Sequence, residues 1–304
     1  MKSRFFLRKY ASTLAITVAM AVLLPLQACA KEMEEQEKQE EPTGITMTTK
    51  AFEVSFIVAG AEDIAIDWGD GKKSDVNDAS RNEDTGTFTF SCVYSGATEH
   101  NIVITGNVTK LDCYGSQLTA LNVSGVTALT ILYCYENQLT ALDVSRNTVL
   151  TDLWCRNNQL TALDVSKNTA LKELNCSYNK LTALDVSKNT VLKKIDCGNN
   201  QLTALDMRAN TSLEDLHLCN TQIKNLDVSA NTALNILCIR NLQFTASALN
   251  DLFRTLPYIP ETKYAFIDIA DNTGAFDCDR SIVEKKGWII NPLHWEPIHT
   301  GDEF

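Results

Sequence analysis

The chain has 304 residues, with 27 Lys and Arg against 38 Asp and Glu, so its formal net charge at pH 7 is −11. This acidic surplus repels phosphate groups, which argues against nucleic acids as partners and against direct contact with anionic lipid headgroups. Motifs of phosphate-binding loops, dinucleotide-binding folds, zinc proteases and Cys-x-x-Cys redox centres are absent from the sequence. We therefore expect no enzymatic activity, no catalytic residue, no metal site and no cofactor.

Residues 1–28 have the features of a secretory signal peptide. A positively charged start is followed by an apolar stretch over residues 11–26, which is short for a membrane span. The stretch Leu26-Gln27-Ala28-Cys29 resembles the lipobox of bacterial lipoproteins. The resemblance implies cleavage after Ala28 and a lipid on Cys29, so that the protein contacts the membrane through this lipid only. An uncleaved anchor helix is the alternative.

Residues 29–43 are predicted to form an acidic tether. Between Lys31 and Glu41 the chain carries six Glu and two Lys, with Met33 as the apolar residue. Such a composition cannot bury a hydrophobic core and remains solvated. A Lys followed by acidic residues directly after the lipidated Cys also resembles the export signal of Bacteroidetes lipoproteins. That resemblance implies an outer-membrane lipoprotein exposed on the surface of a Gram-negative bacterium.

Residues 44–107 are predicted to form a small antiparallel β-sandwich. Alternating apolar residues predict strands at residues 51–58, 64–68, 87–94 and 101–105. Residues 67–71, Asp-Trp-Gly-Asp-Gly, predict a hairpin turn and resemble the turn of PKD-like modules found on surface proteins. A structural hairpin accounts for Asp67 and Asp70, and a calcium site is the alternative. Because the ends of repeat arrays need covers, we expect this domain to cap the segment that follows.

Residues 108–244 repeat a unit of 21 residues. One unit starts at Leu150 and reads Leu-Thr-Asp-Leu-Trp-Cys-Arg-Asn-Asn-Gln-Leu-Thr-Ala-Leu-Asp-Val-Ser-Lys-Asn-Thr-Ala, and the next starts at Leu171. A fixed period of about 20 to 29 residues with the pattern L-x-x-L-x-[L/C]-x-x-N-x-L indicates leucine-rich repeats. Each unit contributes one short strand to a parallel sheet, and the units are stable only when stacked. The predicted fold is therefore a mostly β solenoid.

Each repeat position has a predicted direction. Strand alternation points the fourth and sixth residues inward. The Asn column after the strands is expected to bond the turning backbone, as in the asparagine ladder of this repeat family: Asn137, Asn158, Asn179 and Asn200. The return half lacks helical periodicity, so we expect an extended or irregular path with Leu160, Leu163 and Val165 inward. The Asp column from Asp143 to Asp227 is expected to point outward and bond locally, with a calcium ladder as the alternative.

The sixth repeat position holds five cysteines, which we expect to be buried free thiols: Cys113, Cys134, Cys155, Cys176 and Cys197. Side by side on parallel strands, their Cβ atoms are about 5 Å apart, farther than a disulfide prefers. A linear column also lacks the converging ligands that a metal needs. The pattern resembles the cysteine ladder found among the Listeria internalins and in Bacteroidetes surface proteins. This resemblance covers residues 108–244 and departs in the last two units, which lack the Cys and the Asn.

Residues 245–304 break the register and are predicted to form a last irregular repeat and an α/β C-terminal cap. Apolar spacing predicts a helix over residues 245–256 and a further repeat strand over 266–269, with Asn272 in the ladder column. A short helix over 279–286 and a last strand over 287–290 follow. Cys219 and Cys238 both point outward but lie out of register with each other, so we expect them not to pair.

The outward strand positions vary between repeats, and in the first repeats they are aromatic. We expect these residues to form one partner-binding patch on the concave sheet: Tyr114, Tyr133, Tyr135, Glu136, Trp154, Arg156, Asn157 and Tyr178. Tyr, Trp and Arg are enriched in binding hot spots, although the rings could merely shield the sheet and touch the β-sandwich. The sequence predicts a monomeric module for a protein partner, in adhesion or host interaction as the internalin resemblance implies. Glycan binding and a passive structural role are the alternatives.

Overall fold

The computed structural model describes residues 43–96 and 98–290. The chain divides into two units, Met1–Pro42 and Thr43–Phe304, and the first lies outside the described residues. The expected signal peptide, the lipidation site Cys29 and the tether up to Pro42 therefore lie outside them, as do residues 291–304 of the expected cap. No helix within the described ranges is both long and apolar enough to cross a membrane.

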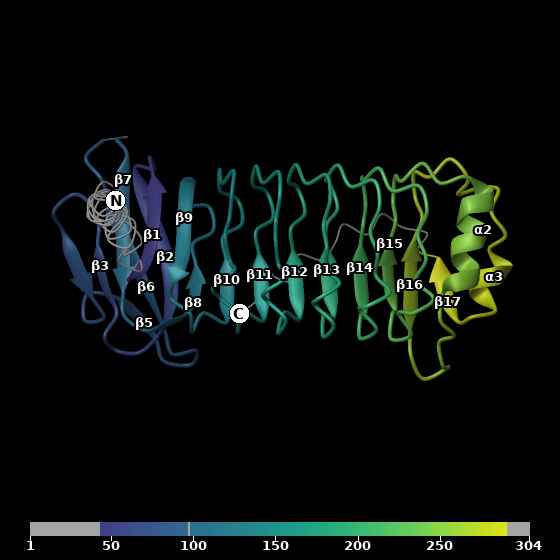
Figure 1. Ribbon diagram of the computed structural model, residues 1–304, viewed down its shortest axis with the longest axis horizontal. Coiled ribbons are helices and arrows are strands. Elements are labelled where there is room, and N and C mark those ends of the chain that lie inside the picture. The colour runs from purple at the N-terminus through teal and green to yellow at the C-terminus, as the bar shows by residue number, and fades with distance from the viewer. Residues whose placement is uncertain (1–42, 97, 291–304) are drawn as a thin grey trace, which may run out of the picture. The chain divides into compact units, whose positions relative to one another are not determined.

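The N-terminal part of the second unit is a β-sandwich of two mostly antiparallel layers (Figure 1). One layer is the five-stranded sheet β4-β3-β7-β1-β9, and the other is the start of a 12-stranded sheet, β5-β6-β2-β8. The first seven strands are β1 (Gly44–Thr49), β2 (Glu53–Gly60), β3 (Ala65–Asp67), β4 (Lys73–Asp75), β5 (Ser80–Asn82), β6 (Thr87–Val93) and β7 (His100–Thr105). Phe56 packs in the core against Trp68 and Phe90, with ring centroids 5.5 and 6.0 Å apart.

The first repeat joins both layers of the β-sandwich. Its strand β8 (Val108–Asp112) pairs antiparallel with β2 on one side and parallel with β10 on the other. Its return half forms β9 (Leu118–Gly125), which pairs antiparallel with β1. The expected boundary after residue 107 thus lies inside two continuous sheets. Among the repeats that the structure describes, this is the return half that becomes a regular strand, because β1 offers it an edge to pair with.

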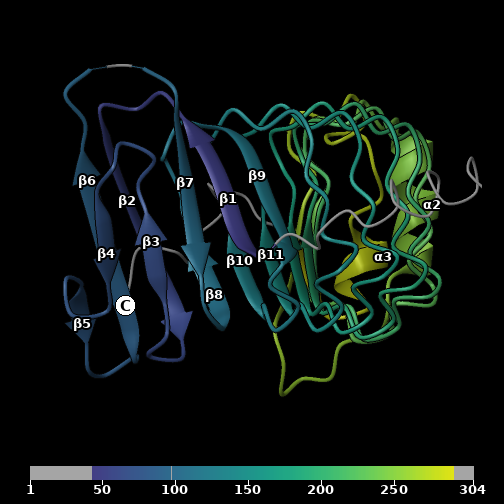
Figure 2. The ribbon, with the colours of Figure 1, turned by 60° about the vertical axis from the view of Figure 1, so that its left-hand side comes forward.

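The following repeats build a parallel sheet, one short strand each (Figures 1 and 2). In order along the sheet these strands are β10 (Ile131–Tyr133), β11 (Asp152–Trp154), β12 (Glu173–Asn175), β13 (Lys194–Asp196), β14 (Asp215–His217), β15 (Ile236–Cys238), β16 (Ala265–Asp268) and β17 (Trp288–Ile290). The central residues of successive strands are register partners, as Leu132 is of Leu153 and Leu153 of Leu174. The solenoid predicted from the 21-residue repeat is confirmed.

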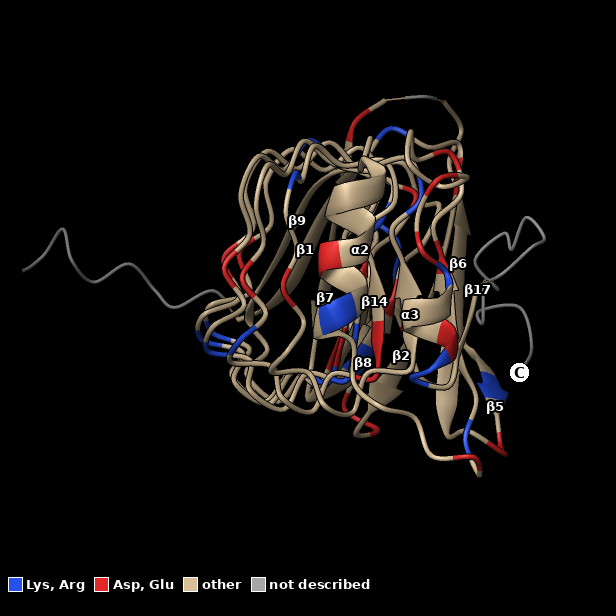
Figure 3. Cartoon of the chain, turned by 90° about the vertical axis from the view of Figure 1, so that its right-hand side faces the viewer, with Lys and Arg blue, Asp and Glu red and all other residues tan. Residues whose placement is uncertain are grey.

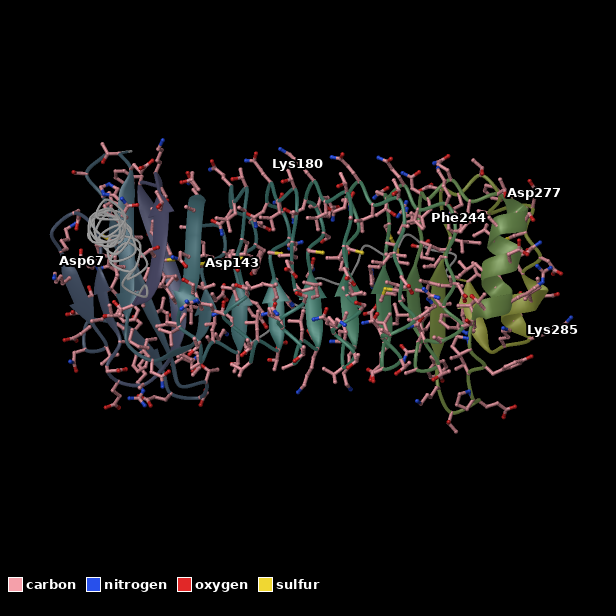
Figure 4. The ribbon with its side chains drawn as sticks, viewed as in Figure 1. Asp67, Asp143, Lys180, Phe244, Asp277 and Lys285 are labelled. Carbon is pink, nitrogen blue, oxygen red and sulfur yellow. A yellow bond between two sulfur atoms is a disulfide. The ribbon has the colours of Figure 1, made fainter. Side chains whose placement is uncertain are left out.

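The interior of the solenoid is filled by the predicted columns. Leu160, Leu163 and Val165 of one return half are all buried, as expected. The five ladder cysteines are buried and free, which confirms that prediction, and sulfur atoms follow one another along the stacked repeats in Figure 4. Burial raises the pKa of the ladder thiols, that of Cys155 to about 12, so these thiols are small apolar fillers.

Two asparagine ladders hold the turns. In the predicted one, Asn158 accepts a hydrogen bond from Leu139 N at 2.9 Å and donates to the carbonyls of Cys134 and Cys155. A second ladder, which was not predicted from the sequence, lies in the return halves and is fully buried: Asn147, Asn168, Asn189, Asn210 and Asn231. Each Nδ2 donates to two carbonyls of the preceding repeat, whereas each Oδ1 has no hydrogen-bond partner among the described residues.

The C-terminal end is closed by α2 (Ala246–Thr255), α3 (Ser281–Glu284) and the strands β16 and β17, and Figure 3 shows both helices at this end. The helix α2 begins at its N-cap Thr245, as predicted, and buries Leu249, Leu252 and Phe253. Asn272 restores the first ladder, because its Oδ1 accepts from Leu242 N at 3.1 Å. The predicted helices and strands of this region are confirmed up to residue 290.

The prediction that Cys219 and Cys238 stay unpaired is wrong, because the two form a disulfide with a Cα–Cα distance of 6.0 Å. The prediction assumed that Cys219 keeps the strand register, in which His217 and not Cys219 lies opposite Cys238. However, β14 ends at His217, and the chain turns at Asn220 with a φ of 58°. Beyond the strand end the register no longer fixes the distance between the two residues, and their Cα separation lies within disulfide range.

Candidate functional site

The outward side chains of β8 and β10–β15, with the residues that directly follow these strands, form one surface, here called the sheet face. One row of this surface consists of register partners on adjacent strands: Asp112, Tyr133, Trp154, Asn175, Asp196, His217 and Cys238. A second row lies two residues further along the chain, since alternate residues share a face: Tyr114, Tyr135, Arg156, Ser177, Gly198, Cys219 and Arg240. The rows are aromatic at the β-sandwich end and small or polar beyond β11.

Four aromatic rings meet on the sheet face and are here called the aromatic cluster: Tyr114, Tyr133, Tyr135 and Trp154. Tyr133 stacks on Trp154 with 4.6 Å between ring centroids, and Tyr114 stacks on Tyr135 with 5.0 Å. Tyr135 and Trp154 are 6.3 Å apart and tilted, which joins the two stacks. Aromatic pairs at such separations are favourable beyond the area they bury. The structure thus brings together four of the five predicted rings.

Two cations lie over rings of the aromatic cluster. Lys110 Nζ is 5.5 Å from the ring centroid of Tyr133, and the guanidinium carbon of Arg156 is 5.3 Å from that of Tyr135. Arg156 also pairs with Glu136 at 2.8 Å. Burial, followed by nearby carboxylates, raises the pKa of both Tyr133 and Tyr135 to about 12. Both hydroxyls are therefore neutral at pH 7 and can donate hydrogen bonds.

Three predicted contact residues follow the strands in the left-handed conformation: Glu136, Asn157 and Tyr178, with φ of 57, 52 and 53°. Asn adopts this conformation readily, and Tyr and Glu do so less often. Arg156 links Glu136 to the aromatic cluster. Tyr178 exposes 52% of its surface, and within residues 43–96 and 98–290 no other ring lies against it. Tyr178 and Asn157 thus lie outside the cluster.

Carboxylates flank the aromatic cluster. Asp112 is the register partner of Tyr133, and Asp152 begins the strand that carries Trp154. In the described part of the chain neither carboxylate forms an ion pair with Lys or Arg. Burial raises the pKa of Asp112 above its ordinary value, because the loss of water outweighs the hydrogen bond from Tyr114 N and the nearby charge of Lys110. Lys110 and Asp152 were not predicted as site residues. Their outward positions in the repeat could have identified them, since both are register partners of Ile131 on the same side of the sheet as the rings.

A second polar group lies further along the sheet face, around His217. Its Nε2 is 2.7 Å from Asp215 Oδ1, and its row neighbours are Asp196 and Cys238. Burial lowers the pKa of His217, but the contact with Asp215 and the charges of Asp215, Asp196 and Asp268 together raise it above its ordinary value. Burial likewise raises the pKa of Asp196. Cys238 continues the row with its disulfide to Cys219.

The alternative calcium sites have local explanations. Asp164 Oδ1 accepts a hydrogen bond from Ser166 N at 2.8 Å, and the other residues of this column repeat the bond, so the predicted local bonding is confirmed. In the hairpin, Asp67 accepts from Gly69 N at 3.0 Å, and Asp70 pairs with Lys72 at 2.8 Å. No group of three or more His, Cys, Asp or Glu in the described ranges could hold a metal ion.

Known proteins resemble the repeat region. The family model described as leucine-rich repeats (2 copies) matches residues 169–210, and no curated protein matches the chain. The functional domain of InlJ from Listeria monocytogenes, which includes a cysteine ladder, is 36% identical with a TM-score of 0.48. Internalin C2 from Listeria monocytogenes is 19% identical with a TM-score of 0.50.

These similarities cover parts of each chain. The InlJ match covers 58% of this chain and 37% of that domain, and the internalin C2 match covers 60% of this chain and 80% of the other. The leucine-rich repeat protein LIC12759 from Leptospira interrogans is 21% identical with a TM-score of 0.47, and the match covers 55% and 44%. The likeness to internalin C2 supports the solenoid fold. The chain thus contains leucine-rich repeats.

Proposed function

We propose that this chain is a recognition module that binds a protein partner through the aromatic cluster of its sheet face. Leucine-rich repeat domains generally mediate protein–protein interactions. The observation that carries the proposal is the packed set of four rings with Lys110 and Arg156 over two of them. Binding hot spots are rich in Tyr, Trp and Arg, and rings held in place before binding lose little entropy.

The way the rings pack favours a protein over a glycan. A sugar stacks on a free ring face, but Tyr133 has Trp154 and Lys110 against it, and Tyr135 has Tyr114 and Arg156. These rings offer edges and hydroxyls, which suit the mixed apolar and polar contacts of a protein interface. The neighbour of Trp154 on the next strand is Asn175, whose side chain is shorter than a ring. The ring of Trp154 is therefore the one on which a glycan would stack. Glycan binding therefore remains the alternative that the test includes.

The location of the protein is part of the same proposal. Lipid on Cys29 would anchor the chain to the outer membrane of a Gram-negative bacterium, and the tether up to residue 43 would hold the module at the cell surface. The disulfide between Cys219 and Cys238 supports an oxidising compartment outside the cytosol, since structural disulfides persist there. In such a place the module would act as a monomer in adhesion or host interaction.

The test is a binding screen of the full chain against host-cell surface proteins and a glycan array. The double variant Trp154→Ala/Tyr135→Ala is measured beside the parent, and Tyr258→Ala is the matched control, because Tyr258 is 76% exposed on the C-terminal cap. We expect the double variant to lose about 2 kcal/mol or more of binding free energy to a protein partner, and the control to lose none.

Other outcomes identify the competing functions. Equal binding by parent and double variant would move the contact site away from the aromatic cluster. Saturable binding to one class of soluble glycan, lost in Trp154→Ala, would replace the protein partner by a carbohydrate. If no surface protein or glycan binds and the double variant is indistinguishable from the parent in cells, a passive structural role replaces recognition.

A further inference from the structure

We infer that the partner of this site is a basic protein segment, which places one large apolar side chain on the aromatic cluster and Lys or Arg side chains on either side of it. This inference rests on the proposed function and adds the chemistry of the partner to it. It rests on a comparison of the cations of the sheet face, which have partners within the chain, with its carboxylates, some of which form no ion pair with Lys or Arg among the described residues.

The cations of the sheet face are committed within the chain. Arg156 pairs with Glu136 at 2.8 Å, and Lys194 pairs with Glu173 at 2.8 Å. Lys110 lies over the ring of Tyr133. A partner therefore meets these groups as neutral pairs or as cations shielded by rings, so the face offers little attraction to an acidic or phosphorylated segment.

The acids of the sheet face exceed these cations. Asp112 and Asp152 flank the stack of Tyr133 on Trp154, and within residues 43–96 and 98–290 neither forms an ion pair with Lys or Arg. Partial burial raises the pKa of Asp112 although Lys110 lies nearby, so its charge is only partly compensated and a further cation would stabilise it. The carboxylates lie beside the rings, so one segment can reach both features.

The acidic character continues beyond the aromatic cluster. Asp196 lies in the same row as Trp154, two strands further along and next to His217, and Asp112 lies two strands back on the other side. Strands are about 4.8 Å apart, so each carboxylate is about 10 Å from the Trp154 position along the row. An extended segment advances about 3.3 Å per residue. A partner lying along this row would therefore carry basic residues about three positions before and after its apolar anchor.

The experiment selects binders from a phage-displayed library of random peptides on the full chain, with Trp154→Ala used to remove peptides that bind elsewhere. We expect the selected peptides to combine an aromatic or large aliphatic residue with surplus Lys and Arg. Their affinity should fall with rising ionic strength, because the attraction is screened. Asp112→Asn and Asp152→Asn should each weaken them about fivefold.

The matched controls are Asp164→Asn and Asp185→Asn, which make the same charge change in the return halves and should leave the affinity unchanged. Circular dichroism of every variant checks that it is folded. Two results would contradict a basic partner but keep the proposed binding site. One is the selection of acidic or neutral peptides whose binding requires Trp154. The other is the selection of basic peptides whose affinity is unchanged in both Asp112→Asn and Asp152→Asn. If the step with Trp154→Ala removes every peptide that binds the parent, the proposed function is overturned instead.

Discussion

Tyr133 on β10 and Trp154 on β11 are register partners, and their rings stack with centroids 4.6 Å apart. The contact joins two successive repeats on the outside of the sheet, while the Leu and Cys columns join them on the inside. Because repeats are stabilised by their neighbours, the same pair of rings can serve both binding and stability. Separating these two contributions needs a measurement of stability alone.

We predict that the rings of Tyr133 and Trp154 are energetically coupled. In a double-mutant cycle of Tyr133→Ala and Trp154→Ala, the coupling free energy from urea unfolding should be about 0.5 to 1.5 kcal/mol. The control cycle combines Trp154→Ala with Tyr258→Ala, whose ring lies near Lys286 of the C-terminal cap, and should show additive effects. Additivity in the first cycle would mean that the stacking adds nothing to stability.

The two asparagine ladders should differ in how much each residue stabilises the fold. Asn179 accepts from Leu160 N at 2.9 Å and donates to the carbonyls of Cys155 and Cys176. Asn189 donates to two carbonyls, but its buried Oδ1 has no partner among the described residues. An unsatisfied buried oxygen costs free energy in the folded state, which offsets part of what the two donated bonds contribute.

We therefore predict that Asn179→Ala lowers the free energy of unfolding by about 3 kcal/mol, and that Asn189→Ala lowers it by about 1 kcal/mol less. Chemical denaturation of both variants gives the comparison, with the exposed Asn225→Ala as the control that should change stability by less than about 0.5 kcal/mol. Equal losses for the two buried residues would indicate that Asn189 Oδ1 is satisfied, for example by an internal water.

The periodic part of this fold could be predicted from the sequence, and the exceptions to the period could not. A repeat of constant length fixes which side of the sheet each column faces, so the burial of Cys155 and the proximity of Tyr133 to Trp154 followed from their positions. The pairing of β9 with β1 and the disulfide of Cys219 with Cys238 depend on where a strand ends or which edge lies nearby. Those are tertiary properties, which the repeat pattern does not determine.

Thiol reactivity should separate the ladder cysteines from the disulfide. Burial raises the pKa of ladder thiols such as Cys155, so iodoacetamide should not modify them in the folded chain, because the thiolate is the nucleophile. After mild reduction, only Cys219 and Cys238 of the sheet face should be alkylated, since both are partly exposed. Mass spectrometry of the digested protein identifies the sites, and alkylation of Cys155 before unfolding would contradict this prediction.

The same disulfide should stabilise the last repeats. It joins residues 19 apart in sequence, and closing a loop of this size in the unfolded chain is worth about 3 kcal/mol. We expect Cys219→Ser/Cys238→Ser to lower the free energy of unfolding by about that amount, and a reducing agent to have the same effect on the parent and none on the variant. A variant as stable as the oxidised parent would show that the bond does not constrain the unfolded chain.

Stability should fall as pH rises through the range in which His217 titrates. The pKa of His217 in the folded chain is raised above the ordinary 6.5, so the folded state holds this proton more tightly than the unfolded state does. The resulting stabilisation is fully present below the unfolded pKa and is lost as pH rises through the folded one. Asp196 acts in the same direction, because burial raises its pKa too.

We predict that replacing His217 by Gln removes this slope. The free energy of unfolding of the parent should decrease between about pH 6 and pH 8, and that of His217→Gln should change less over the same range. The comparison variant is His100→Gln, whose ring stacks on Tyr94 in the β-sandwich with centroids 3.7 Å apart and is remote from the carboxylates around His217. If the slope persists in His217→Gln but disappears in His100→Gln, the pH dependence comes from the β-sandwich, and its assignment to His217 is wrong.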